Sequence, residues 1–258
     1  MMAVYVKGKS PNRVTHDKYV CIMDRHFDHI DTLNDIADVL QYARDICRGL
    51  GVVRMSYHVI PLFAEPNALT TAVYADGFSK EWLALYDTQE FRQSDPIPSR
   101  VMAFGAPMTW REAIEAGQNT AENNAYFEAM REHGLVYGFG LPLFGPGGRD
   151  AYAGIDFGKH VSEIDRESLT TVRAVAQAAH QRICWITDQM TDKPTLSERE
   201  LEVLTWAARG KTTQSIATIL DLSPDTVKTY SKRIYAKLDA SERVGAVLKA
   251  LRLGLVRV

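Results

Sequence analysis

Apolar residues recur with two different periods along the first 190 residues, and the change of period separates helices from strands. A spacing of three or four, as at Leu33, Ile36 and Leu40, predicts a helix. β-Branched residues in partial alternation, as in residues 52–60, predict a strand. The expected helices are residues 31–47, 79–91, 120–133 and 162–189, and the expected strands are residues 52–60, 69–74, 136–144 and 151–157.

Turn residues indicate how these elements connect. Gly145-Pro146-Gly147-Gly148 lies between the last two strands, which predicts an antiparallel hairpin. Asp95-Pro96-Ile97-Pro98 follows the second helix and is expected to end it, because a residue before proline avoids the helical conformation. Helices and strands in this mixed order predict an α+β domain, an α/β/α sandwich in which a sheet lies between helices.

The pattern becomes wholly helical after Pro194. Ser197, with Glu200 three residues later, forms a capping box for a first helix. Thr213 and Ser223 are expected to cap the second and third helices, and Ser241 to open the fourth. The C-terminal region is therefore predicted to be an all-α domain of four helices.

The second and third of these helices are separated only by Asp221 and Leu222, an arrangement typical of a helix-turn-helix. A helix fits the major groove of DNA, with the side chains of its first half at the base edges. A small helical bundle with a solvated basic face would show the same pattern. The side chains expected to contact DNA are Lys228, Thr229, Lys232 and Arg233 on the face opposite the core, with Ser223 and Thr226 at the start of the helix.

Composition agrees with two globular domains. The chain has 258 residues, of which 46% are hydrophobic and 24% charged, and we place a sensor domain at 1–189, a linker at 190–194 and the helical domain at 195–258. The net charge of −2 hides an asymmetry: residues 190–258 hold 12 Lys and Arg against 8 Asp and Glu, a net of +4, and the rest hold 18 against 24, a net of −6. The basic end is the region expected to meet a polyanion.

Other sequence features exclude several classes of protein. There is no apolar run long enough to span a bilayer and no apolar segment near the N-terminus typical of a signal peptide, so we expect a cytoplasmic protein without a membrane partner. Cys21, Cys47 and Cys184 are too few and too far apart for a disulfide framework or a zinc site. His26 and His29 have no partner cysteines and are interpreted as surface residues.

No catalytic motif is present either. The chain lacks a nucleophile elbow, a P-loop and a dinucleotide fingerprint, so we expect no enzyme, no cofactor and no bound metal.

The helical domain resembles a known family. Glu200, Leu204 and Gly210, with Thr226-Val227-Lys228 and Lys237-Leu238, stand where the four-helix DNA-binding domain of LuxR-type regulators has its recurrent residues. The resemblance covers nearly all of residues 195–255, although Tyr230 stands where that family usually has His. It implies a transcription factor that binds double-stranded DNA.

Aromatic residues and one carboxylate are grouped in the middle of the sensor domain. Trp82 and Tyr86 are four apart and share one face of a helix, while Asp95 and Trp110 follow. Aromatic walls with one indole N–H and one carboxylate suit an amphiphilic amide ligand. The alternative is that the aromatic pair belongs to the core and that Asp95, before proline, forms a turn.

The spacing W-x3-Y-x8-DP-x13-W, with Gly138, is similar to that of the acyl-homoserine-lactone-binding domain of LuxR-type quorum-sensing receptors. The resemblance implies that Trp82 donates to the lactone carbonyl of an autoinducer and that Asp95 accepts from its amide N–H. It also implies that Tyr86 and Trp110 pack on the ring and the acyl chain.

Two departures concern the acyl carbonyl. Phe78 stands where the family usually has a Tyr that donates to this carbonyl, and Ala-Tyr-Ala-Gly-Ile at 151–155 lacks the Ser or Thr that shares the task. Tyr152 is then the nearby hydroxyl that could replace them.

We therefore expect an N-acyl-homoserine-lactone-responsive regulator that binds a palindromic operator as a homodimer, since one recognition helix reads too few base pairs. The contact surfaces expected between the two copies are helices 162–189 and 241–252. The alternatives are a related regulator that answers a non-lactone ligand or none, and an enzyme or metabolite-binding protein with a helical tail.

Overall fold

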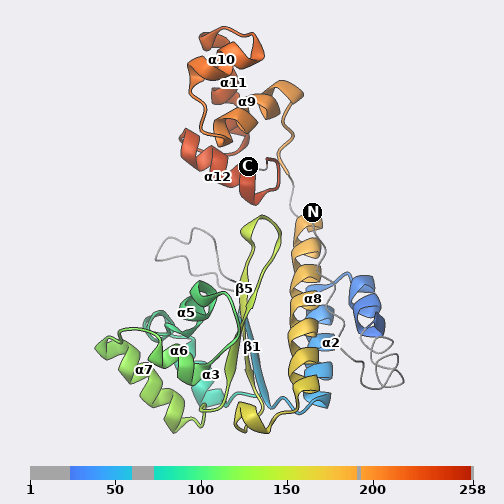
Figure 1. The fold of residues 1–258 in the computed structure, drawn as a ribbon, viewed down its shortest axis with the longest axis vertical. Coiled ribbons are helices and arrows are strands. Elements are labelled where there is room, and N and C mark those ends of the chain that lie inside the picture. The colour runs from blue at the N-terminus through green and yellow to red at the C-terminus, as the bar shows by residue number, and fades with distance from the viewer. Residues whose placement is uncertain (1–23, 60–72, 191–192, 257–258) are drawn as a thin grey trace, which may run out of the picture.

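The structure, a computed structural model, describes residues 24–59, 73–190 and 193–256. It contains a mixed α+β domain followed by a helical domain (Figure 1). The described residues of the α+β domain build a five-stranded sheet with strand order β2-β1-β5-β4-β3, antiparallel throughout. The strands are β1 (Arg54–Val59), β2 (Val73–Asp76), β3 (Met108–Thr109), β4 (Phe139–Leu143) and β5 (Ala151–Asp156).

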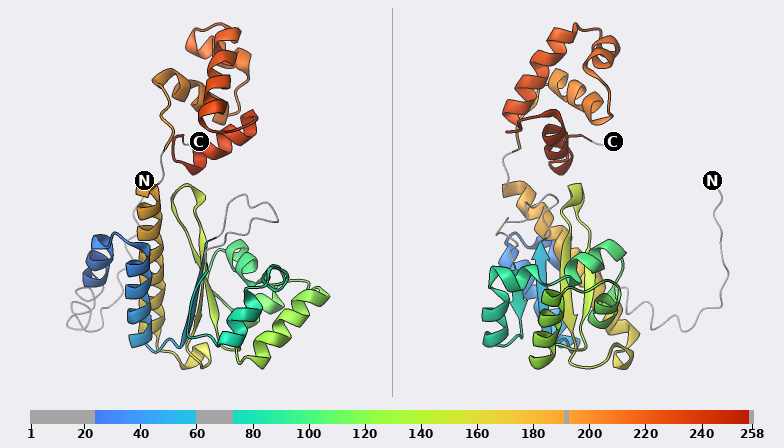
Figure 2. Two further views of the ribbon diagram at one scale, coloured as in Figure 1. Left: turned by 180° about the vertical axis from the view of Figure 1, so that it is seen from behind. Right: turned by 90° about the vertical axis from the view of Figure 1, so that its left-hand side faces the viewer.

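Helices cover both faces of this sheet, which confirms the predicted α/β/α sandwich (Figures 1 and 2). One face carries α2 (Ile36–Gly49) and the long α8 (Arg166–Met190). The opposite face carries α3 (Lys80–Tyr86), α4 (Gln89–Gln93), α5 (Ile97–Phe104), α6 (Trp110–Glu115) and α7 (Ala121–Glu132).

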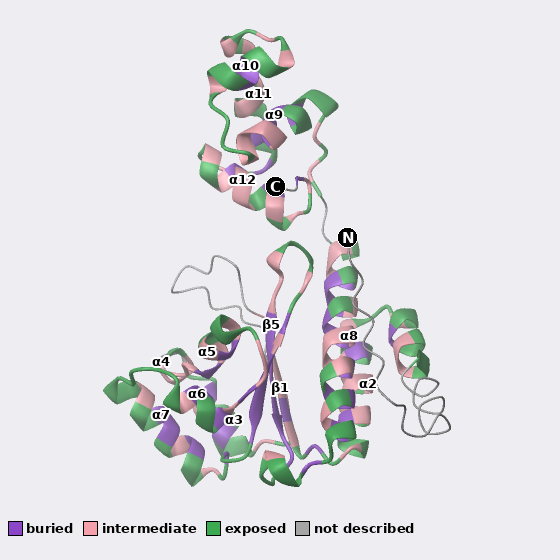
Figure 3. Ribbon diagram, in the orientation of Figure 1, coloured by how far each residue is buried: buried purple, intermediate pink, exposed green. Residues whose placement is uncertain are grey.

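Because side chains alternate along a strand, the sheet builds a separate core on each face. On β1, Met55 packs in the core toward α2 and α8, together with Cys47 and Val172. The core on the other face contains Trp82 and Tyr126. Figure 3 shows both layers as buried positions along the strands and along the inner sides of the helices.

Three predicted helices have different bounds in the structure. The expected helix 31–47 is two helices, because residues 24–32 form a separate helix and Asp35 then caps α2, accepting from the backbone N–H of Ala37 at 2.7 Å. The expected helix 79–91 is interrupted at Asp87 and continues as α4. The long helix begins at Arg166 instead of at 162, because residues 161–163 form a separate 3₁₀ turn.

The segment 95–115 contains more regular structure than the sequence predicted. Asp95-Pro96 does end one helix, but it also opens α5, where Asp95 Oδ1 accepts from the backbone N–H of Ile97 at 2.9 Å. Proline is tolerated in the first turn of a helix, where its missing N–H has no intrahelical partner. Neither β3 nor α6 was predicted, and the expected strand 69–74 falls partly outside the described residues, the observed β2 being Val73–Asp76.

The helical domain has the four predicted helices: α9 (Glu198–Ala208), α10 (Thr213–Leu220), α11 (Pro224–Lys237) and α12 (Arg243–Arg252). Leu204, Ile216, Val227 and Ile234 form the centre of its core. The predicted caps at Ser197 and Ser223 are present, whereas α10 is capped by Thr212 instead of Thr213. Glu242 precedes α12 without a side-chain cap, so Ser241 is not the capping residue.

The predicted hairpin is also present, and its tip reaches the helical domain. β4 and β5 pair from Leu143 and Ala151, and the turn at Pro146–Gly148 touches the end of α12. Gly147 lies so close that a Cβ there would be 2.5 Å from the carbonyl oxygen of Arg252. Among the described helices, none is long and apolar enough to cross a membrane.

Candidate functional site

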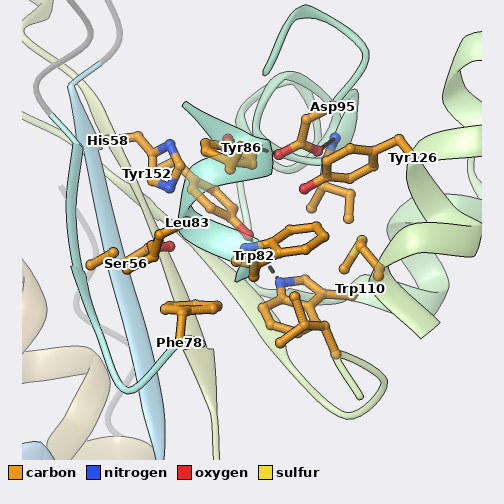
Figure 4. A pocket seen from close by; sticks show the side chains of 14 residues that line it. Ser56, His58, Phe78, Trp82, Leu83, Tyr86, Asp95, Trp110, Tyr126 and Tyr152 are labelled. Carbon is orange, nitrogen blue, oxygen red and sulfur yellow. Dashed lines mark hydrogen bonds between the residues drawn. The ribbon is translucent and has the colours of Figure 1, made fainter. Parts of the chain in front are cut away.

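A cavity lies between the sheet and the helices α3, α5 and α7 (Figure 4). Side chains that are far apart in the sequence meet here, because α3 to α7 all pack on this face. All six residues that the sequence predicted for a ligand pocket line it, namely Phe78, Trp82, Tyr86, Asp95, Trp110 and Tyr152.

Asp95 accepts hydrogen bonds from several donors at the start of α5. The Tyr86 hydroxyl donates to its Oδ2 at 3.1 Å and the Ile97 backbone N–H donates to its Oδ1, while the Tyr126 hydroxyl lies near the carboxylate and favours its ionised form. Burial of the carboxylate raises its pKa to about 6, even though these hydrogen bonds and the charge of Arg100 favour the ionised form. The residue is half-buried as a whole, with the carboxylate turned inward.

Trp82 forms the centre of the aromatic wall. Ser79 caps α3 by accepting from the backbone N–H of Trp82 at 3.1 Å, which positions the backbone that carries the indole. Its ring lies 6.0 Å from that of Tyr86 and 5.8 Å from those of Phe91 and Tyr126, between centroids. Within the described residues no acceptor is found for the indole N–H of Trp82, so this donor is available to a ligand.

Trp110 and Tyr152 are joined across the cavity. The indole Nε1 of Trp110 donates to the Tyr152 hydroxyl at 3.0 Å. The Tyr152 ring lies over Gly140, where a Cβ would come within 2.5 Å of it. Burial raises the pKa of the Tyr152 hydroxyl, which therefore stays protonated. Since this hydroxyl already accepts a hydrogen bond, its own proton is free to point elsewhere.

Several lining residues were not predicted from the sequence. α7 contributes Tyr126 and Met130, and β1 contributes Ser56 and His58. Alternation along the expected strand 52–60 puts Ser56 and His58 on one face, and this signal could have identified them. Burial and the charge of Arg92 lower the pKa of His58 to about 4, so the imidazole is neutral near pH 7.

A second candidate surface lies on α11. Lys228, Thr229, Lys232 and Arg233 are exposed there, on the side away from the buried Val227, as the sequence predicted. The first turn of the helix also carries the negative charge of Asp225. This exposed carboxylate forms an ion pair with Lys228 at 3.0 Å.

The two remaining predicted DNA contacts serve as structural groups. Ser223 caps α11 by accepting from the backbone N–H of Thr226, and the two hydroxyls lie 2.8 Å apart. Behind this surface, Lys237 on α11 pairs at 2.6 Å with Glu200, which is only 3% exposed. This ion pair holds α11 against α9.

The cysteines and the histidine pair near the N-terminus have structural neighbours. Cys47 and Cys184 are buried, and Cys21 lies outside the described residues. His26 is not a free surface residue, because its Nδ1 is 3.0 Å from the Tyr42 hydroxyl. The described residues contain no cluster of three His, Cys, Asp or Glu that could hold a metal ion.

Comparison with known protein families divides the chain in the same way. Residues 35–183 match the family described as the autoinducer binding domain. Residues 194–250 match the family described as bacterial regulatory proteins, luxR family. The first match contains every predicted pocket residue, and the second contains α9 to α11 and most of α12.

Individual relatives are regulators of the same kind. The chain is 31% identical over 204 residues to the quorum sensing-dependent transcriptional regulator RpaR of Rhodopseudomonas palustris, a match that covers 79% of this chain and 83% of that protein. It is 27% identical over 231 residues to the quorum-sensing regulator RhlR of Pseudomonas aeruginosa, covering 87% and 92%.

Solved structures share the fold. Escherichia coli SdiA superposes with a TM-score of 0.68 at 21% identity, covering 95% of this chain and all of that one. A second SdiA structure, a complex with octanoyl-rac-glycerol, superposes with a TM-score of 0.67 at 20% identity, covering 96% and 100%.

Proposed function

The chain belongs to the LuxR family of quorum-sensing transcriptional regulators, and we propose that its sensor domain binds an N-acyl-homoserine lactone and that it binds a two-fold symmetric operator as a homodimer. The family is one of regulators and not of enzymes. The small molecule is thus a signal, and we expect it to be bound and released without chemical conversion.

One observation carries the ligand proposal: Asp95, with a pKa of about 6, faces a cavity in which the indole N–H of Trp82 has no acceptor among the described residues. A carboxylate acceptor and a separate N–H donor in an aromatic wall match an amide next to a second carbonyl. In this pose the ligand's amide N–H donates to Asp95, and Trp82 Nε1 donates to the lactone carbonyl. Tyr86 and Trp110 pack on the ring and the acyl chain.

The acyl carbonyl then needs a donor, because an unpaired buried carbonyl costs about 1–3 kcal/mol. Phe78 has no hydroxyl to offer. Tyr152 does, and its hydroxyl accepts from Trp110 Nε1, which leaves its proton free for the ligand. We assign this role to Tyr152.

On the DNA side, α11 is proposed as the recognition helix. Lys228 and Lys232, one turn apart, are placed to reach base edges or flanking phosphates, with Thr229 beside them. Ser223, Thr226 and Arg233 are better placed for the sugar-phosphate backbone. Two such helices in a dimer would read half-sites about one helical turn apart (~10 bp).

A second candidate ligand class is a non-lactone amphiphile. The SdiA complex holds octanoyl-rac-glycerol, an ester whose glycerol hydroxyls could donate to a carboxylate in place of an amide N–H. Phe78 removes a donor to the acyl carbonyl, which both ligand classes carry, so the two classes are distinguished by the group that meets Asp95.

Two experiments test the proposal. Calorimetric titration of the full-length protein against a panel of acyl-homoserine lactones and monoacylglycerols would show which class binds, and binding of glycerides alone would contradict the lactone assignment. Gel shift with genomic DNA, with and without the bound molecule, followed by sedimentation on the selected operator, would test regulation and dimerisation. A ligand-bound protein that stays monomeric on its operator would contradict the dimer.

A further inference from the structure

β1 gives the pocket a second polar wall. Ser56 and His58 are two residues apart on this strand, and both side chains line the cavity. Figure 4 shows them on the side of the cavity opposite Asp95 and Tyr126. His58 is only 7% exposed, so its imidazole is almost wholly enclosed by the pocket.

These two side chains differ from the other polar groups in the pocket. Asp95, Tyr86, Trp110 and Tyr152 all bond to protein partners. Ser56 Oγ and the two ring nitrogens of His58 make no hydrogen bond within the described residues. These polar atoms reach the surface of the cavity, because neither residue is among the described side chains with a buried, unpaired nitrogen or oxygen. An apolar ligand group placed over them would bury them without a partner, which is unfavourable.

The geometry around Gly154 indicates where a ligand atom would sit. Ser56 is paired with Gly154 of β5 in the sheet. A Cβ at position 154 would be 2.7 Å from Ser56 Oγ and 3.3 Å from the Tyr152 hydroxyl. Two hydroxyls thus converge over a residue that has no side chain, and on the other side of Ser56 the neighbour on β2 is the small Ala75.

His58 borders the same hollow. It is paired with Tyr152 in the sheet, and its ring meets those of Tyr152 and Tyr86 edge to face, at centroid distances of 5.3 and 5.8 Å. A neutral imidazole has one donor and one acceptor nitrogen. Since its pKa is about 4, the ring offers both throughout the physiological range.

We infer that Ser56 and His58 form a second polar contact of the pocket, which selects an acyl group bearing a hydroxyl or keto oxygen over an unsubstituted alkyl chain of the same length. This inference rests on the proposed function and specifies the ligand class further. The amide is bound at Asp95, and the oxygen on the chain is bound at β1. A plain alkyl chain would leave both side chains desolvated without a partner.

The test uses matched ligands and the full-length protein. Homoserine lactones with equal chain length, either unsubstituted or carrying a 3-oxo, 3-hydroxy or terminal hydroxyl group, are titrated by calorimetry. We expect the wild type to prefer at least one oxygenated ligand by about tenfold, the factor associated with one well-made hydrogen bond. Ser56→Ala and His58→Phe should each reduce that preference to about threefold or less without weakening the binding of the alkyl ligand.

A control variant and three outcomes make the result decisive. His160→Phe makes the same exchange at an exposed position and should leave all affinities unchanged. If no lactone of either kind binds, the proposed function fails. If lactones bind without preference, or if both variants weaken oxygenated and alkyl ligands equally, the proposed function stands and the inference about β1 is wrong. Circular dichroism of each variant separates this last result from misfolding.

Discussion

Gly138 and Trp110 are packed against each other at the edge of the sheet. The backbone N–H of Trp110 donates to the carbonyl of Gly138 at 2.8 Å. The indole then folds back over Gly138, so that a Cβ there would lie 2.4 Å from three of its carbons. The glycine is required by this close approach and not by its backbone angles. It thus supports the pocket, although it does not line it.

Gly138→Ala should therefore damage ligand binding from outside the pocket. The new methyl group displaces the indole and lengthens the bond from Trp110 to Tyr152. We expect at least a tenfold loss of lactone affinity and destabilisation of about 1–3 kcal/mol, as for overpacking elsewhere. Titration and urea unfolding measure both. Gly49→Ala, a glycine with open space around it, is the matched control, and Trp110→Phe in the Gly138→Ala background should restore some of the stability.

Ligand affinity should depend on pH through Asp95. Its pKa of about 6 lies above the ordinary value, so the carboxylate is protonated in the folded protein below pH 6. A protonated carboxyl no longer accepts as a charged group, and affinity should fall by up to about tenfold per pH unit below 6. Above pH 6 it should be constant. The stability of the ligand-free protein should depend on pH in the opposite direction. Because burial of the ionised carboxylate opposes folding, Asp95 lowers the free energy of unfolding above pH 6, and this effect is absent below the ordinary pKa of the group.

The neighbours of Asp95 identify it as the titrating group. Tyr86 and Tyr126 have pKa values well above 10, and His58 titrates near 4. Arg92 and Arg100 are the cationic side chains next to His58 and Asp95. Titrations from pH 5 to 7.5 with Asp95→Asn should show weaker binding, by about 1.5–3 kcal/mol, and a flat pH profile. A wild-type profile that the substitution leaves unchanged would assign the effect to another group.

Phe78→Tyr tests the pose of the ligand. The ring lines the cavity, and the substitution adds a hydroxyl where LuxR-type receptors usually have one. With an ordinary acyl-homoserine lactone, affinity should improve or stay the same, because the acyl carbonyl gains a second donor. Trp82→Phe should weaken binding by about 1 kcal/mol in the same titration, since it removes one neutral hydrogen bond. Loss of response in Phe78→Tyr with a harmless Asp95→Asn would point to a different ligand.

Lys228→Ala tests the proposed role of α11 as the recognition helix. If Lys228 reaches a base edge, its loss should cost about 1–3 kcal/mol and relax the preference at one base pair. Binding to a library of operator variants in gel shifts measures both. Lys159→Ala removes an equal charge from an exposed site in the sensor domain and should leave the preference intact. An equal weakening on all sequences, with a shallower salt dependence, would make Lys228 a phosphate contact.

Glu200→Ala should loosen the helical domain. Glu200 Oε2 accepts from the Ser197 backbone N–H at 2.7 Å and from Lys237 Nζ, so one side chain serves both a cap and an ion pair. Burial alone would raise its pKa, but these hydrogen bonds lower it. We expect the free energy of unfolding of the helical domain to fall by about 1–2 kcal/mol, an amount limited by the exposure of Lys237. Glu200→Gln should cost less, because its side chain keeps an acceptor oxygen. Hydrogen exchange of α9 and α11 in the full chain measures it. Protection that is unchanged in Glu200→Ala would contradict this role.

Local chemistry made the helical domain predictable. The caps at Ser197 and Ser223 and the turn at Asp221 act over a few residues, and α9 to α12 lie close to where the sequence indicated them. The same is true of the Gly-Pro hairpin and of α7, which Thr120 caps. Where the predicted cap was one residue off, two hydroxyl residues stand side by side, and it is Thr212 whose side chain accepts from the Ser215 backbone N–H.

The sequence alone thus determined the order of most elements, the α/β/α class, the exposed basic face of α11 and six aromatic or acidic residues that share a cavity. Tertiary structure decided what surrounds them. Ser56 and His58 enter the pocket only through the pairing of β1 with β5, and Tyr126 through the packing of α7 over Asp95. Such contacts join residues dozens of positions apart. Alternation along β1 puts Ser56 and His58 on one face, but no cap, turn or period indicates which distant side chains that face meets. The physical reason is that capping and turn bonds are made within a few residues, whereas a cavity is the space left when distant side chains pack.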